Sequence, residues 1–175
     1  MERTLVILKP DAVARGIAGE IITRFERAGL KIIAVKMVAP NEAHYHRHYE
    51  DIGQLISRRG EDVYRRNADF MESGPVVAMV LEGVQAVSVV RKMVGETEPH
   101  KAQPGTIRGD YAHMTIEHSN QRGSGLPNLV HASADAKEAN ALFGAERSLL
   151  EEINRCSNVS HLMLSDPLQW FVTFQ

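Results

Sequence analysis

The sequence has very little cysteine: Cys156 is the only one among 175 residues. A single cysteine excludes an internal disulfide and is typical of a protein in a reducing compartment. No apolar run approaches the roughly 20 residues that a membrane-spanning helix needs. The N-terminus opens directly on a strand pattern, so we expect no signal peptide. We therefore expect a cytoplasmic protein without a membrane partner.

The sequence also lacks an excess of basic charge, with 20 Lys and Arg against 22 Asp and Glu. A net charge of −2 gives no general attraction for nucleic acid, so we expect no nucleic-acid partner. Any phosphate group would have to be bound by a few local cations. The apolar content of 43% and the charged content of 24% are ordinary for a globular protein of this length.

Four familiar catalytic or nucleotide-binding motifs are missing. There is no G-x-x-x-x-G-K-[ST] loop and no G-x-G-x-x-G fingerprint. There is also no G-x-S-x-G nucleophile turn and no H-E-x-x-H zinc motif. A protein of this sequence that acts on nucleotides must therefore hold them by another route.

What the sequence does contain is a strand–helix pattern that occurs twice. Apolar runs and helical spacing predict strands at 3–8, 30–38, 76–81 and near 129–130, and helices at 19–28, 84–94 and 135–152. One or two short helices are expected within 40–59. We interpret 52–68 as a polar connection and 95–127 as a long segment with little periodicity. This order predicts an α+β fold, the ferredoxin-like βαββαβ sandwich, with helices packed on a four-stranded antiparallel sheet.

The stretch from Pro127 to Ser133 is the main candidate for chemistry. An apolar run ends at His131, two small residues follow, and a predicted helix begins. A histidine between a strand exit and a helix start lies where backbone N–H groups favour phosphate. Neutral imidazole is a competent nucleophile near pH 7. The alternative is a histidine that only packs or caps, and the stretch by itself does not decide between them.

Two further features suit phosphate, and one suits a metal. Lys9 ends a buried strand, and Gly105 and Gly109 flank Arg108, so that the backbone could approach a ligand gripped by the guanidinium. His44 and His48 are spaced to share a helix face, with His46 between them, and could bind a metal. The alternative for these histidines is a solvated helix face.

Several motifs in order resemble the nucleoside diphosphate kinase family. They are Leu8-Lys-Pro-Asp-Ala-Val13, Gly19-Glu-Ile-Ile22, Arg24-Phe-Glu26, His48-Tyr49, Ser73-Gly-Pro-Val-Val-Ala-Met79, Gly95-Glu-Thr97, Pro104-Gly-Thr-Ile-Arg-Gly-Asp110 and Asn128-Leu-Val-His-Ala-Ser133. The resemblance implies an enzyme that moves γ-phosphates from nucleoside triphosphates, typically ATP, to nucleoside diphosphates. It also implies a homo-oligomer, a tetramer or a hexamer.

By matching position, the resemblance implies that His131 is the nucleophile that becomes phosphohistidine in a ping-pong mechanism. The implied nucleotide-binding residues are Lys9, Tyr49, Arg91, Thr97, Arg108 and Asn128. Lys9, Arg91, Thr97 and Arg108 would contact phosphates, and Asn128 would meet the sugar hydroxyl. The implied cofactor is Mg²⁺, bridging the terminal phosphates with no metal ligand from the protein. A site that holds only sugar and phosphates would tolerate all bases.

The sequence departs from the family pattern in four places. Leu142 occupies the position of a glutamate that holds the second nitrogen of the histidine in the family. The region between Tyr49 and Phe70 is longer than usual, so the aromatic that stacks on the base has no clear match and Tyr64 is the candidate. The segment 112–126 is also longer than usual, at a place where it would bear on subunit contacts. From about residue 141 the chain diverges, although we expect 1–175 to form a single domain. These departures leave a catalytically weakened, nucleotide-binding regulatory homologue as the alternative function.

Overall fold

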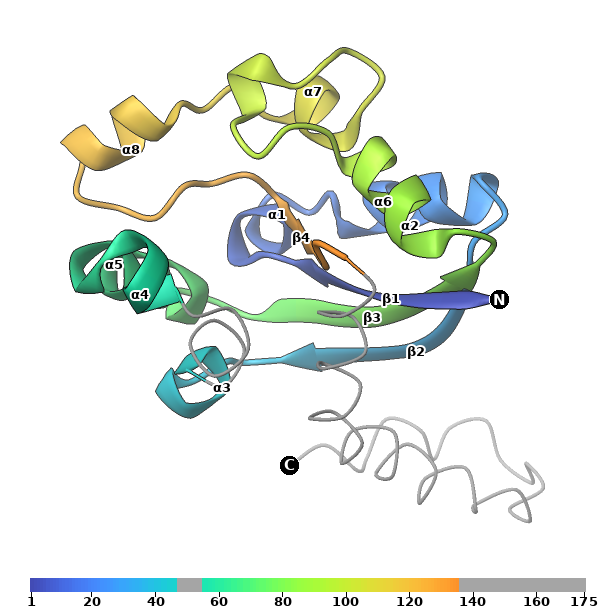
Figure 1. Cartoon of the computed structure of the whole chain (residues 1–175), viewed down its shortest axis with the longest axis horizontal. Helices are drawn as coiled ribbons and strands as arrows, with labels where there is room; N and C mark the ends of the chain where they lie inside the picture. Colours follow the sequence, from blue (N-terminus) through green and yellow to red (C-terminus); the bar gives the residue numbers. More distant parts are fainter. Residues whose placement is uncertain (47–54, 136–175) are drawn as a thin grey trace. The chain divides into compact units, whose positions relative to one another are not determined.

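The computed structural model describes residues 1–46 and 55–135, with the side chains of His44, Leu55 and Ser57 left out (Figure 1). Its elements are β1 (Glu2–Leu8), α1 (Pro10–Ala14), α2 (Ala18–Arg27), β2 (Lys31–Val38), α3 (Glu42–His46), α4 (Leu55–Arg59), α5 (Glu61–Glu72), β3 (Val76–Gly83), α6 (Ala86–Val94), η2 (Pro99–Lys101), α7 (Ile107–Tyr111), α8 (Ile116–Gln121) and β4 (Val130–Ala132). All of these elements belong to one compact unit.

The four strands form one sheet in the order β2-β3-β1-β4. Each neighbouring pair is antiparallel: β1 with β3, β1 with β4, and β2 with β3. The two strand–helix–strand halves interlock, because β1 and β3 lie side by side in the centre. The predicted ferredoxin-like α+β sandwich, with its four-stranded antiparallel sheet, is confirmed.

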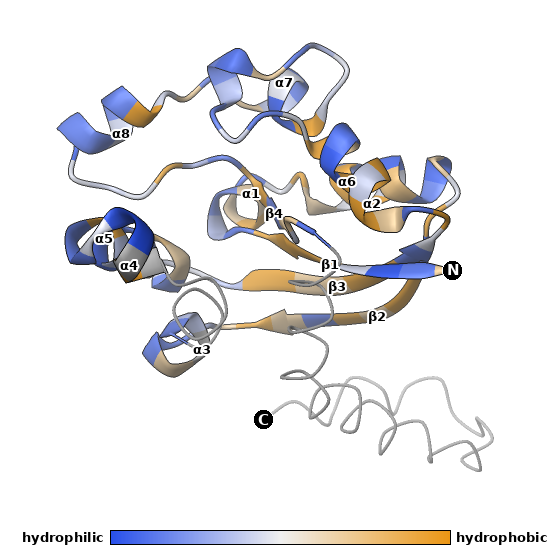
Figure 2. Ribbon diagram, in the orientation of Figure 1, coloured by the Kyte–Doolittle hydropathy of each residue, from blue (hydrophilic) through white to orange (hydrophobic). Residues whose placement is uncertain are grey.

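The hydrophobic core lies between one face of the sheet and the helices α2 and α6 (Figure 1). Alternate residues of the central strands face it, as the period of two requires. Helices α2 and α6 contribute residues at helical spacing, including Ile21, Phe25, Val90 and Val94. Figure 2 shows the apolar colour concentrated on the central strands and the facing sides of these helices, whereas α5 and α8 are largely polar.

The predicted polar connection over 52–68 is wrong, because α4 and α5 occupy most of it. Helix α5 buries Tyr64, Ala68 and Met71, which recur at a spacing of four and then three residues. Because charged residues lie between them, the composition of the segment does not reveal this narrow apolar stripe. The helix contacts α1, α3 and α4, so its remaining faces stay polar.

The segment 95–127 also contains more regular structure than its weak periodicity predicts. It forms η2, α7 and α8, each six residues long or shorter. Thr106 and Thr115 begin α7 and α8 as N-caps, with side-chain oxygens accepting from Gly109 and His118 N–H groups. Among the described residues, no helix has both the length and the apolar character needed to cross a membrane. The helix expected at 135–152 lies outside the described residues.

Candidate active site

The pairing of β4 with β1 fixes the position of His131. His131 is opposite Ile7, while Val130 and Ala132 are opposite Leu8 and Val6. Val130 and Ala132 are buried in the core, so the alternation of a strand directs His131 to the other face of the sheet. The expectation that His131 marks a strand exit is therefore wrong: it is the middle residue of β4.

A tight turn centred on Leu129 delivers the chain into β4. Leu129 has a φ of 69°, and the N–H of Val130 donates to the Asn128 carbonyl at 2.8 Å. A γ-turn with a positive φ is rare and strained for a residue with a side chain. Leu129 is held in it by two contacts, because its N–H donates to Asp11 Oδ2 at 3.0 Å and its carbonyl accepts from the Lys9 N–H at 2.8 Å. Such over-determined strain is typical of functional sites.

Lys9 lies at the junction of β1 and α1, where it is confirmed to end the strand. It occupies the N-cap position of α1, and Pro10 follows as the first helical residue. Burial, opposed by Asp11 and aided by nearby Arg108, lowers the pKa of its ammonium to about 8. Its Nζ lies 5.6 Å from the ring centroid of Phe70. Lys9 is thus a buried cation beside the strand that carries His131.

Asp11 is a site residue to which the sequence assigned no role. Burial raises the pKa of its carboxyl, against the opposing effects of Lys9 and of the N–H of Leu129. One carboxyl oxygen holds the Leu129 N–H, as described above. The only sequence signal for Asp11 is its position directly after Lys9 and Pro10. Its partner Leu129 lies more than a hundred residues away in the chain, so no local pattern could predict this contact.

Arg108 is buried and reaches three backbone carbonyls around the turn. Its Nε donates to the Asn128 carbonyl at 3.1 Å, one Nη donates to Gly95 at 2.9 Å, and the other donates to Val130. The guanidinium therefore ties the end of α6 to both sides of the Leu129 turn. Arg108 was predicted from the family pattern as a phosphate ligand; in this structure it also supports the backbone on which His131 sits.

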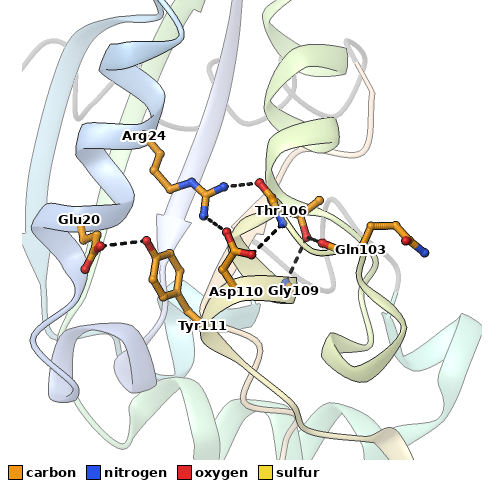
Figure 3. Close-up of polar contacts among 8 residues, drawn as sticks. Glu20, Arg24, Gln103, Thr106, Gly109, Asp110 and Tyr111 are labelled. Atoms are coloured by element: carbon orange, nitrogen blue, oxygen red, sulfur yellow. Dashed lines mark hydrogen bonds and ion pairs between the residues drawn. The ribbon is translucent and has the colours of Figure 1, made fainter.

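Helix α7, which carries Arg108, is fastened to α2 by a polar cluster (Figure 3). Arg24 from α2 pairs with Asp110 at 2.6 Å and also donates to the Gly105 carbonyl. Asp110 in turn accepts from the Gly105 N–H at 2.7 Å. The Gly105 N–H and Arg24 together lower the pKa of Asp110. Tyr111 adds a bond from its hydroxyl to Glu20 at 3.0 Å.

Three of the predicted nucleotide-binding residues, Lys9, Thr97 and Asn128, line one pocket of about 440 Å³. Asn128 is buried, and its Nδ2 donates to the Thr97 carbonyl at 2.8 Å. Its Oδ1 has no hydrogen-bond partner among the described residues. A buried acceptor without a donor is costly, and a sugar hydroxyl could supply that donor. The remaining lining comes from α4, α5, α8 and the segment that follows α8.

Arg91 lies on the last turn of α6 and does not share this pocket with Lys9. It lines a neighbouring pocket of about 840 Å³ together with Thr97, Thr106 and Lys92. A third pocket, of about 620 Å³ and lined by Asp135, also includes Arg91. Thr97 is common to the pockets of about 440 and 840 Å³, so Lys9 and Arg91 line adjoining spaces and not a single one.

Several sequence-based predictions fall on residues that the structure does not describe. Tyr49, His48 and Leu142 are among them. Tyr64 is described, but its ring is packed inside the helical layer, 5.0 Å from that of Tyr45. Its neighbour Val63 lines the Lys9 pocket instead. Within residues 1–46 and 55–135, no three His, Cys, Asp or Glu side chains gather as a metal site.

Comparison with known proteins gives a consistent match. The family described as "Nucleoside diphosphate kinase" matches residues 2–145. A nucleoside diphosphate kinase of Borreliella burgdorferi is 43% identical over 139 residues, covering 79% of this chain and 83% of the relative. One of Pyrococcus furiosus is 48% identical over 139 residues, covering 79% of this chain and 78% of the relative.

Two solved structures are similar as well. The first is a transition-state mimic of the Borrelia burgdorferi nucleoside-diphosphate kinase with bound vanadate and ADP, at a TM-score of 0.76 and 41% identity. The match covers 80% of this chain and 83% of the Borrelia chain. The second is an NDP kinase from Pyrobaculum aerophilum, at a TM-score of 0.71 and 42% identity. This match covers 79% of this chain and 91% of the Pyrobaculum chain.

Proposed function

The chain belongs to the nucleoside diphosphate kinase family, and from this premise we propose that it transfers the γ-phosphate of a nucleoside triphosphate to a nucleoside diphosphate. The transfer proceeds in two steps through a phosphohistidine at His131. In the first, an imidazole nitrogen bonds to the γ-phosphorus and the nucleoside diphosphate leaves. In the second, a terminal oxygen of another diphosphate takes the phosphoryl group and restores the imidazole.

The observation that carries this proposal is the ladder between β1 and β4. It holds His131 opposite Ile7, two residues before Lys9, and the Lys9 N–H bonds to Leu129. The nucleophile and the buried cation are therefore held by one short, strongly hydrogen-bonded unit. Phosphoryl transfer depends mainly on such positioning and on neutralising charge. Lys9, Thr97, Arg91 and Arg108 would receive the phosphates, and Asn128 Oδ1 would accept from the sugar.

Mg²⁺ is the proposed cofactor, and it would be held mainly by the phosphate oxygens of the nucleotide. The pocket lining suits that arrangement, because besides Lys9 the polar side chains that the structure describes there are amides, hydroxyls and arginines, with no carboxylate among them. When bound, the metal supplies charge neutralisation at the terminal phosphates. The protein's own residues then bind and orient the nucleotide against His131.

The test is phosphate transfer from ATP to GDP in the presence of Mg²⁺, with three proteins compared. The wild type should form GTP, as should the control variant His113→Ala, which removes an exposed histidine. His131→Ala should form none while keeping its folded spectrum and melting temperature. Turnover by His131→Ala would overturn the mechanism. A wild type that binds ATP without forming GTP would instead establish the regulatory alternative.

We also propose a homo-oligomer, supported by the outer strand of the sheet. Among the strands that the structure describes, β2 pairs on one side only, with β3. Val35 and Met37 on this strand are 55% and 62% exposed, although they face the same side as core residues of β3. An exposed apolar edge strand is a ready pairing surface. Met37→Lys should lower the assembly size measured by sedimentation, whereas Lys36→Gln, on the opposite face, should not.

A further inference from the structure

The ammonium of Lys9 is buried without an ion-pair partner in the part of the chain that the structure describes. The residue is 8% exposed, and none of the ion pairs among residues 1–46 and 55–135 includes it. Asp11 attracts it, but one oxygen of that carboxyl accepts from the Leu129 N–H at 3.0 Å. Because burial disfavours a charged group, a cation that must stay charged here needs a further attraction from elsewhere in the fold.

The ring of Phe70 on α5 supplies such an attraction. Lys9 Nζ lies 5.6 Å from the ring centroid, within the roughly 6 Å over which the electron-rich face of an aromatic ring attracts a cation. This attraction is stronger for a cation that has lost part of its hydration, as a buried ammonium has. A carboxylate in the same place would cancel the charge and occupy N–H donors. The uncharged ring does neither, so the ammonium keeps its charge and its donors for phosphate oxygens.

Phe70 contacts Lys9 from outside the Lys9 pocket. Lys9 lines that pocket, as do Val63, Arg66 and Asn67 of α5, whereas Phe70 is not among the lining residues. Helix α5 also contacts α1, of which Lys9 is the N-cap. The ring is therefore placed to act on a bound nucleotide only through the ammonium of Lys9.

Gly125 confines the Phe70 side chain. A Cβ at position 125 would lie 2.7 Å from Phe70 Cβ, 3.1 Å from Phe70 Cγ and 3.0 Å from the Arg66 carbonyl oxygen. Only a residue without a side chain can approach α5 this closely. The segment that follows α8 thus packs against the root of the Phe70 side chain and restricts the directions in which the ring can turn. A ring held in this way offers Lys9 a preformed contact.

We propose that Phe70 is a positioning residue for phosphoryl transfer, which holds the charged ammonium of Lys9 at the pocket wall through a cation–π contact. This inference rests on the proposed function, in which Lys9 receives the phosphates. Burial, partly opposed by Asp11, already lowers the pKa of Lys9 to about 8. Because the ring face attracts the ammonium but not the neutral amine, loss of the ring would lower this pKa further. Lys9 would then lose its charge close to neutral pH.

The other charged and titratable groups around Lys9 stay the same when only the ring is changed. On the elements around Lys9 they are Asp11 of α1, Arg59 of α4, Arg66 of α5, Arg108 of α7 and His131 of β4. Asp11 raises the pKa of Lys9, and Arg108 lowers it. Since a Phe70 variant alters none of these groups, a change in the titration of Lys9 reports its contact with the ring.

The test follows the Lys9 ammonium in two ways in the full chain. Its titration is measured by NMR of nitrogen-15 lysine side chains, assigned with Lys9→Arg, and kcat/KM for GDP with ATP as donor is measured from pH 6 to 9. We expect both midpoints near pH 8 in the wild type. Phe70→Met, which keeps an apolar side chain of similar length without a ring face, should move both to about pH 7. At pH 8 its kcat/KM should be about fivefold lower than that of the wild type.

Two further changes separate the charge distribution of the ring from its volume. Phe70→Tyr keeps the ring face and should keep both midpoints near pH 8. A trifluorinated phenylalanine in place of Phe70 keeps the shape of the ring but withdraws electron density from its face, so it should move the midpoints as Phe70→Met does. Glu72→Gln is the control, because Glu72 is exposed and two positions along α5, away from the face of Phe70. It should match the wild type.

Midpoints that stay near pH 8 in both Phe70→Met and the trifluorinated protein would overturn the proposal. A loss of kcat/KM that is equal at every pH would also overturn it, because that pattern would give the ring a structural role alone. So would a rise of the midpoints in Phe70→Met, since the ring would then act by excluding water. Failure of the proposed function looks different: the wild type would transfer no phosphate, while the NMR titration would still report the contact between Lys9 and the ring.

Discussion

Arg108 Nε donates to the backbone carbonyl of Asn128 at 3.1 Å, and the same carbonyl accepts from the Val130 N–H at 2.8 Å. The carbonyl that closes the strained turn is therefore also the anchor of the guanidinium. Because Leu129 stands at the centre of that turn, Arg108 and Asp11 hold it from two directions. The path of the backbone into His131 depends on side chains from two distant segments.

We expect Arg108→Ala to destabilise the fold as well as to weaken nucleotide binding. Three buried or half-buried carbonyls lose the hydrogen bond from Arg108, and hydrogen bonds to a charged group contribute about 1.5–3 kcal/mol each. With partial compensation by water, the free energy of unfolding should fall by about 3 kcal/mol, measured by urea denaturation. Arg108→Lys should recover only part of this, because one ammonium cannot reach three diverging carbonyls. Unchanged stability in Arg108→Ala would show that these contacts do not hold the turn.

The depressed pKa of Lys9, about 8, predicts opposite effects of pH on activity and stability. As the pH rises through 8, the ammonium loses its charge, so kcat/KM for the diphosphate should fall. The unfolded chain keeps this proton up to about pH 10.5, so Lys9 makes a contribution to stability that rises with pH between about 8 and 10.5.

Parallel activity and melting curves from pH 7 to 10 test the Lys9 prediction. Lys9→Arg, which stays charged, should lack the fall in kcat/KM centred near pH 8. Lys101→Arg changes an exposed lysine and serves as the matched control. If Lys101→Arg altered the profile while Lys9→Arg did not, the assignment to Lys9 would be wrong.

The Arg24–Asp110 contact should couple α2 to the active site. Both side chains are partly exposed, so we expect Arg24→Ala to cost only about 1 kcal/mol of stability. Its larger effect should be on KM, because loosening α7 moves Arg108. A double-mutant cycle with Asp110→Ala, measured on both stability and KM, should give a coupling energy of about 0.5–1 kcal/mol. If the effects of the two substitutions were additive, the Arg24–Asp110 interaction would contribute neither to stability nor to KM.

Gly109→Ala should be strongly destabilising because α7 packs directly on the preceding loop. A Cβ at this position would lie 2.1 Å from the Gln103 carbonyl oxygen and 2.9 Å from Thr106 Oγ1. Backbone must then move, at a cost of about 1–3 kcal/mol. Gly19→Ala is the control: nothing lies within 4 Å of its Cβ, and it should stabilise α2 by about 0.5–1 kcal/mol. Equal unfolding midpoints for the two variants would contradict the close packing.

Periodicity was sufficient to predict the central strands and the helices α2 and α6. Their apolar residues recur at the spacing of the element and end at Gly29 and Gly95, both with positive φ. Composition failed for α5, because three buried side chains are spread among many charged ones. It also failed for α7 and α8, which are too short to show a period.

The motif around His131 was recognisable from sequence, but its supporting contacts were not. No local pattern predicts that Leu129 adopts a positive φ, because the contacts that impose it come from Asp11 and Lys9. Similarly, the pattern around Arg108 suggests a phosphate ligand, whereas its carbonyl partners depend on how distant segments meet. Such partners follow from the tertiary fold and cannot be inferred from spacing.

Since Arg108 bonds to Asn128 and Val130, residues 109–127 form a loop whose two ends are fastened by a single side chain. Lengthening such a loop costs little entropy and leaves its base in place. The segment that includes α8 can therefore change in length and sequence while the histidine strand keeps its position. The pocket wall that α8 supplies can thus be redesigned separately from the placement of the nucleophile, so α8 is a suitable place to exchange or randomise when the pocket is to be reshaped.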